Sequence, residues 1–205
     1  MTEPVTTPDL LTRLADLRNE DDVVIATMTA GILWPQHTKH EMDLWMMAPM
    51  GAASPMGLGI AMARPDLGVI VLDSDGAILM SLGSLVTIGG KRPARFLHII
   101  LENEAYDITG GQPLPGNGTQ SLPEFAESLG YARGLRSAQS ADLEKAVQDV
   151  HDGLGPILLA VPVTRGDFQF AHMTEWATSE KAMLRTGGPG YAHLRDHIAA
   201  HPVKT

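Results

Sequence analysis

The sequence contains no cysteine in 205 residues. Disulfide bonds, sites in which thiolates bind zinc, and a cysteine nucleophile are therefore excluded. Because disulfide bonds are typical of oxidising compartments, their absence fits a cytoplasmic protein, and we expect that location.

The sequence also lacks long apolar runs and a surplus of basic residues. No run reaches the roughly 18 apolar residues expected of a transmembrane helix, and the first residues show no signal-peptide pattern. Lysine and arginine number 15 against 24 acidic residues, which gives a net charge of −9. We therefore expect neither nucleic acid nor membrane as a partner, although backbone amides could still form a local anion site.

What the sequence does contain is an alternation of strand and helix patterns in a chain that is 44% hydrophobic. This alternation predicts an α/β fold with a doubly wound, mainly parallel sheet flanked by helices. Strands are expected at 23–27, 44–47, 69–72, 96–101 and 157–163. Helices are expected at 10–19, 53–63, 77–89, 122–129, 141–151, 174–184 and 191–201. The segment 104–120 is expected to be a long irregular loop, which is often functional.

Two of these predicted strands end in polar clusters. The first ends at Asp75-Gly76, and the second is followed by Asn103, 28 positions later. If the strands are neighbours in a parallel sheet, both clusters lie at its carboxyl edge, where ligands bind in open α/β sheets. A carboxylate, an amide and nearby carbonyl groups suit a hard cation such as Mg²⁺.

The pair Asp75-Gly76 and Asn103 resembles the cofactor signature of thiamine-diphosphate enzymes. Within that superfamily the runs Leu79–Gly89 and Asn103–Gln112, with Met50-Gly51 upstream, resemble the sulfopyruvate and phosphonopyruvate decarboxylases. The similarity covers roughly residues 20 to 165. It implies the thiamine-diphosphate-binding fold, with the diphosphate-binding (PP) domain at 20–166, a helical lead-in at 1–19 and a helical extension at 167–205.

The resemblance also implies roles for single residues. Asp75, the side-chain oxygen of Asn103 and the carbonyl of Ala105 would hold Mg²⁺. Gly76 and Ala77 would begin a helix whose amide groups hold the diphosphate. The residues implied to bind the cofactor are Ala48, Met50, Gly51, Ser74, Asp75, Gly76, Ala77, Asn103, Ala105, Tyr106, Asp107 and Ile108. In this set the Ala48 carbonyl would accept from the aminopyrimidine, and Met50 would lie beneath the cofactor.

Two positions depart from the signature: Ser74 stands for a glycine, and Glu102 for an asparagine. Serine tolerates fewer backbone conformations than glycine, so the turn at Ser74 is expected to be altered. Glu102 is not at the metal-ligand position. His37 and His40 are further candidates for catalysis, because histidine titrates near neutral pH.

The resemblance covers only one half of a complete thiamine site. In the enzymes that the sequence resembles, a second, pyrimidine-binding domain supplies the glutamate that activates the cofactor, and we expect this chain to be too short to include that domain. We therefore expect a separate pyrimidine-binding subunit, in an α2β2 hetero-oligomer or a multiple of it. The implied activity is decarboxylation of a small 2-oxo acid, and carboligation is a close variant.

Two alternative functions from other classes of protein remain. The stretch Val69–Gly76 also fits haloacid-dehalogenase-type phosphatases, with Asp73 as nucleophile, Asp75 as acid and base, and Mg²⁺ as cofactor. That reading leaves Asn103 unexplained and lacks a downstream acidic pair. A non-catalytic partner that keeps a cofactor-like fold is the other alternative.

Overall fold

The computed structural model describes residues 3–46, 50–116, 121–166 and 187–203, and they are built around a parallel sheet. Its six strands lie in the order β2-β1-β3-β4-β8-β7, with every neighbouring pair parallel. The strands are β1 (Asp22–Thr27), β2 (Asp43–Met46), β3 (Gly68–Ser74), β4 (Phe96–Glu102), β7 (Arg133–Arg136) and β8 (Ile157–Pro162). β1 and β2 are buried along their whole lengths, as expected for parallel strands covered on both faces.

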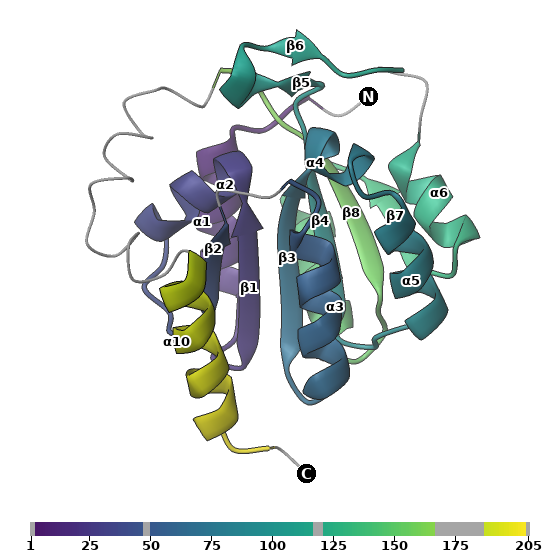
Figure 1. Ribbon diagram of the computed structural model, residues 1–205. Coiled ribbons are helices and arrows are strands. Elements are labelled where there is room, and N and C mark those ends of the chain that lie inside the picture. The colour runs from purple at the N-terminus through teal and green to yellow at the C-terminus, as the bar shows by residue number, and fades with distance from the viewer. Residues whose placement is uncertain (1–2, 47–49, 117–120, 167–186, 204–205) are drawn as a thin grey trace.

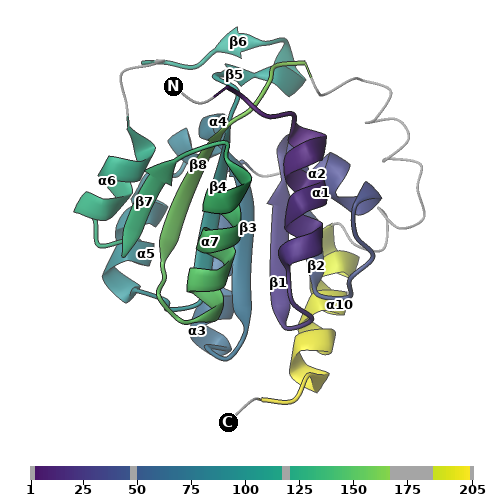
Figure 2. The same ribbon diagram turned by 180° about the vertical axis from the view of Figure 1, so that it is seen from behind.

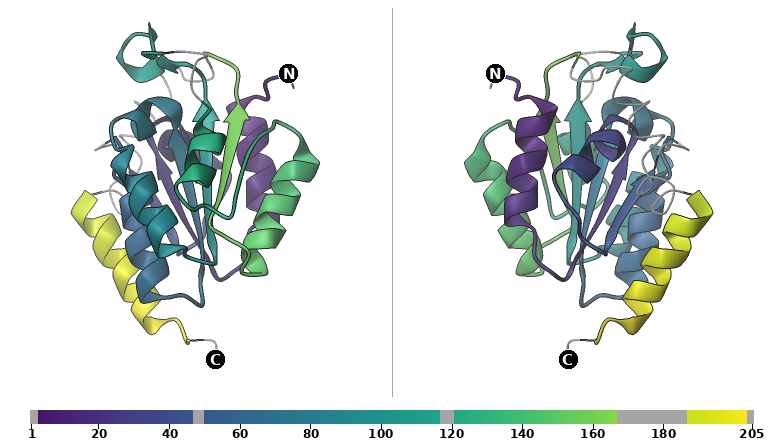
Figure 3. Two further views of the ribbon diagram at one scale, coloured as in Figure 1. Left: turned by 90° about the vertical axis from the view of Figure 1, so that its right-hand side faces the viewer. Right: turned by 90° about the vertical axis from the view of Figure 1, so that its left-hand side faces the viewer.

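Helices cover both faces of the sheet, so the expected doubly wound α/β class is confirmed (Figures 1 and 2). One core lies under α1 (Thr7–Leu17), α2 (Met28–Leu33) and α7 (Ser140–His151). The other core lies under α3 (Ala53–Ala63), α4 (Asp75–Leu79), α5 (Gly83–Lys91), α6 (Leu122–Ser128) and α10 (Gly187–Ala200). Figure 3 shows the sheet between these two helical layers.

Three local predictions differ from the structure. The helix predicted at 77–89 is two helices, α4 and α5, because the amides of Met80 and Ser81 turn back to carbonyls three residues earlier. The segment 104–120 is not wholly irregular, since β5 (Ala105–Tyr106) pairs with β6 (Gln112–Pro113) in a short hairpin. The edge strand β7 was not predicted, because its four residues include two arginines and a glycine.

Gly57 allows α3 to pack closely on the sheet. A Cβ added to Gly57 would lie 2.6 Å from a methyl group of Val71 in β3. Gly59 has open space around it, so the helix approaches the sheet only through its inner face.

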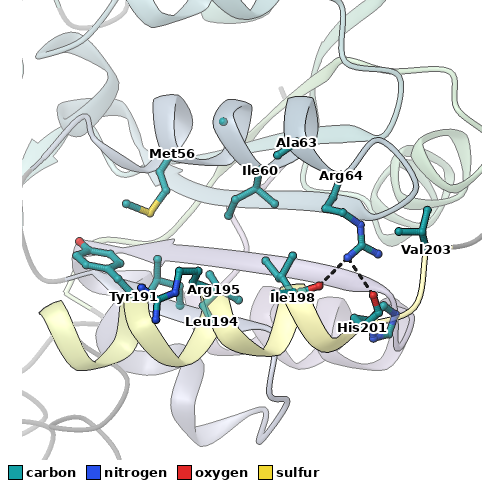
Figure 4. A pocket seen from close by; sticks show the side chains of 13 residues that line it. Met56, Ile60, Ala63, Arg64, Tyr191, Leu194, Arg195, Ile198, His201 and Val203 are labelled. Atoms are coloured by element: carbon teal, nitrogen blue, oxygen red, sulfur yellow. Dashed lines mark hydrogen bonds between the residues drawn. The ribbon is translucent and has the colours of Figure 1, made fainter.

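The helix α10 packs on β2 and faces α3 across a pocket lined by both helices (Figure 4). Arg64, at the end of α3, pairs with Asp66 and donates to the carbonyls of Ile198 and His201 (Figure 4). The positive charge of Arg64 at the C-terminal end of α3 complements the dipole of this helix. The predicted helix 174–184 falls outside the described residues. No helix in the described ranges is long and apolar enough to cross a membrane.

Candidate functional site

The candidate site lies where the winding of the sheet reverses. After β1 the chain enters α2 on one face, and after the neighbouring β3 it enters α4 on the other. Such a switch point opens a crevice at the carboxyl ends of the strands. The residues that line a cavity there are Met28, Thr29, Met50, Ser74, Gly76, Asn103, Ala105, Tyr106, Asp107, Ile108 and Thr109.

Ser74 connects β3 to α4 and acts as the N-cap of the helix. Its backbone is extended (φ −121°, ψ 158°), and its Oγ accepts from the amide of Ala77 at 3.2 Å. Serine is among the preferred N-cap residues for this reason. Because any residue can adopt this extended backbone, a glycine is not required here. The serine therefore does not force the altered turn that we expected.

Asp75 is the first residue of α4, and its carboxylate is buried. Oδ1 accepts from the amide of Gly76 at 2.8 Å, and Oδ2 accepts from the amide of Glu104 at 2.7 Å. Burial, reinforced by the negative charges of Glu104 and Asp107, raises the pKa of Asp75 to about 6, although the two amide bonds oppose the shift. Asp75 therefore lies among negative charges, and a bound cation would balance them.

Asn103 follows β4, the strand next to β3, and faces the same edge of the sheet. Its Nδ2 donates to Asp107 Oδ2 at 2.8 Å, and its Oδ1 accepts from the amide of Ala105 at 3.2 Å. The two predicted ligands are thus connected through the residue that follows Asn103, because the amide of Glu104 donates to the carboxylate of Asp75.

The carbonyl of Ala105 is not used by its hairpin. The amide of Leu114 donates to the carbonyl of Glu104, which makes Glu104 and Leu114 a hydrogen-bonded pair of the antiparallel ladder. Ala105 and Pro113 form the next pair, which is therefore non-hydrogen-bonded. The Ala105 carbonyl points away from β6 and is available to a ligand.

These donors fit a hard divalent cation. They consist of a buried carboxylate from Asp75, an amide oxygen from Asn103 and a backbone carbonyl from Ala105, which is the oxygen chemistry that Mg²⁺ prefers. In the described part of the chain, no group of three or more His, Asp or Glu side chains is arranged to hold a metal. A metal here would depend on this mixed set of donors.

Most of the other predicted cofactor residues line the same cavity, whereas Asp75 and Ala77 are buried next to it and do not line it. Met50 lines it, as do Tyr106, Asp107 and Ile108. A Cβ on Gly76 would lie 2.8 Å from the Tyr106 ring, so glycine allows the hairpin to pack on the start of α4.

Gly51 supports this arrangement from outside the cavity. It has a left-handed φ of +79°, and a Cβ there would lie 2.7 Å from Ser81. Ala48 falls outside the described residues.

Neither candidate histidine is brought to this cavity. His40 accepts from Arg18, which also holds Asp43 and the carbonyl of Asp22, the first residues of β2 and β1. His40 therefore lies at the amino edge, opposite Asp75. His37 contacts Thr12 in α1, with 3.1 Å between Nδ1 and Oγ1.

Burial lowers the pKa of both candidate histidines, and the charge of Arg18 adds to the effect at His40. At neutral pH the neutral imidazole is therefore favoured further at His37 and His40.

Asp73 is placed too deeply to act as a phosphatase nucleophile. Its side chain is fully buried, its Oδ1 accepts from the amide of Ser74, and its Oδ2 lies 3.5 Å from His98 Nε2. His98 Nδ1 in turn lies 3.3 Å from the Tyr131 hydroxyl. Burial, with the charge of Asp73, raises the pKa of Tyr131. This chain of polar side chains lies inside the core.

Sequence reasoning missed three residues around the site. Met28 and Thr29 line the cavity directly after β1, and Met28 adopts a left-handed φ of 53°. Arg165, beyond the end of β8, donates to the carbonyls of Asn103 and Glu104. Their positions after predicted strands were the available signal, because all carboxyl ends of a parallel sheet meet at one edge.

Two arginines, Arg133 and Arg136, form ion pairs within the chain. Arg136 Nε lies 2.6 Å from Glu102 Oε2, and Arg133 lies 2.6 Å from Asp149. Burial is the largest cause that raises the pKa of Glu102, and the charge of Arg136 opposes it.

Comparison with known proteins finds relatives that are named as decarboxylases. A phosphonopyruvate decarboxylase of Streptomyces viridochromogenes is 32% identical over 75% of this chain and 38% of its own length. The sulfopyruvate decarboxylase subunit beta of Methanocaldococcus jannaschii is 34% identical over 60% of this chain and 65% of its own length. The chain thus spans less than two thirds of either relative.

Solved structures share the fold. The 4-hydroxybenzoylformate decarboxylase of Rhodococcus jostii, described as thiamine diphosphate-dependent, superposes with a TM-score of 0.68 at 22% identity. The match covers 82% of this chain and 34% of that protein.

A protein-family model also matches the sequence. The family model for the C-terminal TPP-binding domain of thiamine pyrophosphate enzymes matches residues 22–161. The chain therefore belongs to the family of thiamine pyrophosphate enzyme C-terminal TPP-binding domains.

Proposed function

We propose that this chain is the diphosphate- and Mg²⁺-binding subunit of a split thiamine-diphosphate-dependent 2-oxo acid decarboxylase of the sulfopyruvate or phosphonopyruvate decarboxylase type. The observation that carries the proposal is that Asp75, which accepts from the Glu104 amide, lies beside the loop of Asn103 and Ala105, and that this loop lines the cavity at the switch point of a TPP-binding domain. The similarity to relatives named as beta subunits supports the split arrangement.

When bound, thiamine diphosphate would supply a carbon nucleophile and an electron sink for loss of carbon dioxide from a 2-oxo acid. Asp75, Asn103 and the Ala105 carbonyl would hold Mg²⁺. The amides of Gly76 and Ala77 would turn from Asp75 and Ser74 to the diphosphate, which a helix start favours.

The remaining residues around the cavity would orient the cofactor and exclude water. Met50 would lie beneath the rings, and its flexible thioether suits an irregular gap. The Ala48 carbonyl would accept from the aminopyrimidine. Tyr106 and Ile108 line the cavity and would shield the reacting centre from solvent.

The complete site would require a second subunit. A separate pyrimidine-binding subunit would supply the activating glutamate, in an α2β2 assembly or a multiple of it. The buried position of Asp73 weighs against the phosphatase alternative.

The test titrates the chain with Mg²⁺ and thiamine diphosphate, with and without a pyrimidine-binding subunit, and follows carbon dioxide released from sulfopyruvate and phosphonopyruvate. We expect release only in the mixture, and we expect Asp75→Ala to abolish metal-dependent cofactor binding. Full activity of the chain alone would contradict the split arrangement. Phosphatase activity lost in Asp73→Asn, without thiamine binding, would contradict the whole proposal. An acyloin product in place of a free aldehyde would indicate carboligation.

A further inference from the structure

The segment that follows β8 runs along the loop that follows β4. The amide of Val163 donates to the carbonyl of Glu102 at 3.0 Å. Arg165 Nε donates to the carbonyl of Asn103 at 2.7 Å, and its Nη2 donates to the carbonyl of Glu104 at 3.1 Å. The segment 163–165 therefore holds three consecutive carbonyls, one from the last residue of β4 and two from the loop that follows it.

Glu104 is the strained residue of this loop. Its φ of 61° is in the left-handed region, which costs free energy for a residue with a side chain. This conformation accompanies the bond from the Glu104 amide to Asp75 Oδ2, at 2.7 Å. Strained backbone of this kind persists only where surrounding contacts hold it in place.

Arg165 has the chemistry to hold it. A guanidinium presents several N–H groups in a rigid planar fork, which here reaches two neighbouring carbonyls at once. Its charge also lies 3.6 Å from the carboxylate of Glu104. A lysine would keep the charge but would lose the fork.

We propose that Arg165 is the positioning residue of the metal loop. Its guanidinium holds the carbonyls of Asn103 and Glu104, and so keeps the Glu104 amide on Asp75 and the Asn103 side chain at the cavity. The role toward a metal rests on the proposed function, whereas the role in holding the loop does not. Arg165 acts through the loop and does not itself line the cavity.

The first experiment measures hydrogen exchange at the amides of Glu104 and Ala105 in the full chain without metal. Loss of two hydrogen bonds from a charged donor should speed their exchange by about tenfold or more in Arg165→Ala. Arg165→Lys should fall between that variant and wild type. Arg195→Ala is the matched control, because Arg195 is an exposed arginine that is paired with Asp196.

Two results would overturn the positioning role. One is unchanged exchange at Glu104 and Ala105 in Arg165→Ala. The other is equal acceleration at Ile99 within β4, because this would report a general loss of stability rather than a local release of the loop.

The second experiment measures Mn²⁺ binding to the full chain by the electron paramagnetic resonance of the free ion, with thiamine diphosphate present. Arg165→Ala should weaken binding by about tenfold, with Arg165→Lys intermediate and Arg195→Ala unchanged. Wild-type affinity in Arg165→Ala would overturn the role toward the metal. If the wild-type chain does not bind Mn²⁺ even with the pyrimidine-binding subunit present, the proposed function fails, and the exchange experiment still decides whether Arg165 holds the loop.

Discussion

At the scale of single residues, Asp75 combines deep burial with negative neighbours, and its pKa is raised from 3.8 to about 6. The native state therefore binds more protons at Asp75 than the unfolded chain does between these pH values. Stability of the metal-free chain consequently falls as pH rises through this window. A divalent cation would reverse the effect, because it binds the ionised carboxylate.

The first prediction isolates this contribution. In metal-free buffer, the unfolding free energy of wild type relative to Asp75→Asn should fall by up to about 3 kcal/mol between pH 4 and pH 7. Urea unfolding at a series of pH values measures it. Added Mg²⁺ should recover part of the loss in wild type only. A difference that stays constant across pH would refute the raised pKa.

A second residue-scale prediction concerns the N-cap of α4. Ser74→Ala removes the acceptor for the Ala77 amide and should cost about 1 kcal/mol of unfolding free energy. Ser74→Gly, which restores the glycine of the family signature, should cost only a few tenths, since glycine is tolerated at N-caps. Equal losses in the two variants, measured by urea unfolding, would show that Ser74 does not act as a cap.

At the scale of elements, the contact between α5 and α6 depends on one glycine. A Cβ on Gly89 would lie 2.2 Å from the carbonyl oxygen of Leu129, which is backbone and cannot easily yield. Gly90, the next residue of α5, has open space around it. Two neighbouring glycines of one helix therefore have different physical roles.

The third prediction compares these neighbours. Gly89→Ala should lower the unfolding free energy by about 3 kcal/mol through overpacking. Gly90→Ala should leave it unchanged or raise it by up to about 1 kcal/mol, because alanine favours helix. Thermal or urea unfolding checks both. A Gly89→Ala chain as stable as Gly90→Ala would mean that α6 moves away from α5 without cost.

At the scale of the whole molecule, our proposal is that the chain carries one side of a site. The described residues supply oxygen donors and helix-start amides at the carboxyl edge, and we have proposed that the activating glutamate comes from another subunit. The chain spans 65% of a relative named as a beta subunit but only 38% of a phosphonopyruvate decarboxylase.

The fourth prediction follows from an α2β2 assembly. With the pyrimidine-binding subunit at fixed concentration, carbon dioxide release should rise with added chain and saturate at one chain per partner subunit. Static light scattering should report the matching mass. Saturation at another ratio would refute the α2β2 arrangement, whereas activity in either component alone would refute the need for both.

Much of the fold could be predicted from local pattern. The run Val69–Leu72 was predicted as a strand of the mainly parallel sheet and lies within β3, and α3 begins and ends where the sequence predicted. The break between α4 and α5 was missed, because Leu79–Leu85 keeps a helical pattern while the backbone turns at Ser81. β7 was missed because its sequence, with two arginines and a glycine, lacks a strand-like run.

The sequence by itself determined the α/β class and the order of its main elements, because these follow from periodicity, and it indicated the family through the resemblance of its motifs around Asp75 and Asn103 to the thiamine-diphosphate signature. Only the tertiary structure decided which side chains share the cavity. It set His40 at the opposite edge, buried Asp73 against His98, and brought Arg165 to Asn103 across 62 positions. Those outcomes depend on strand order and on a left-handed backbone at Glu104, which local sequence does not encode.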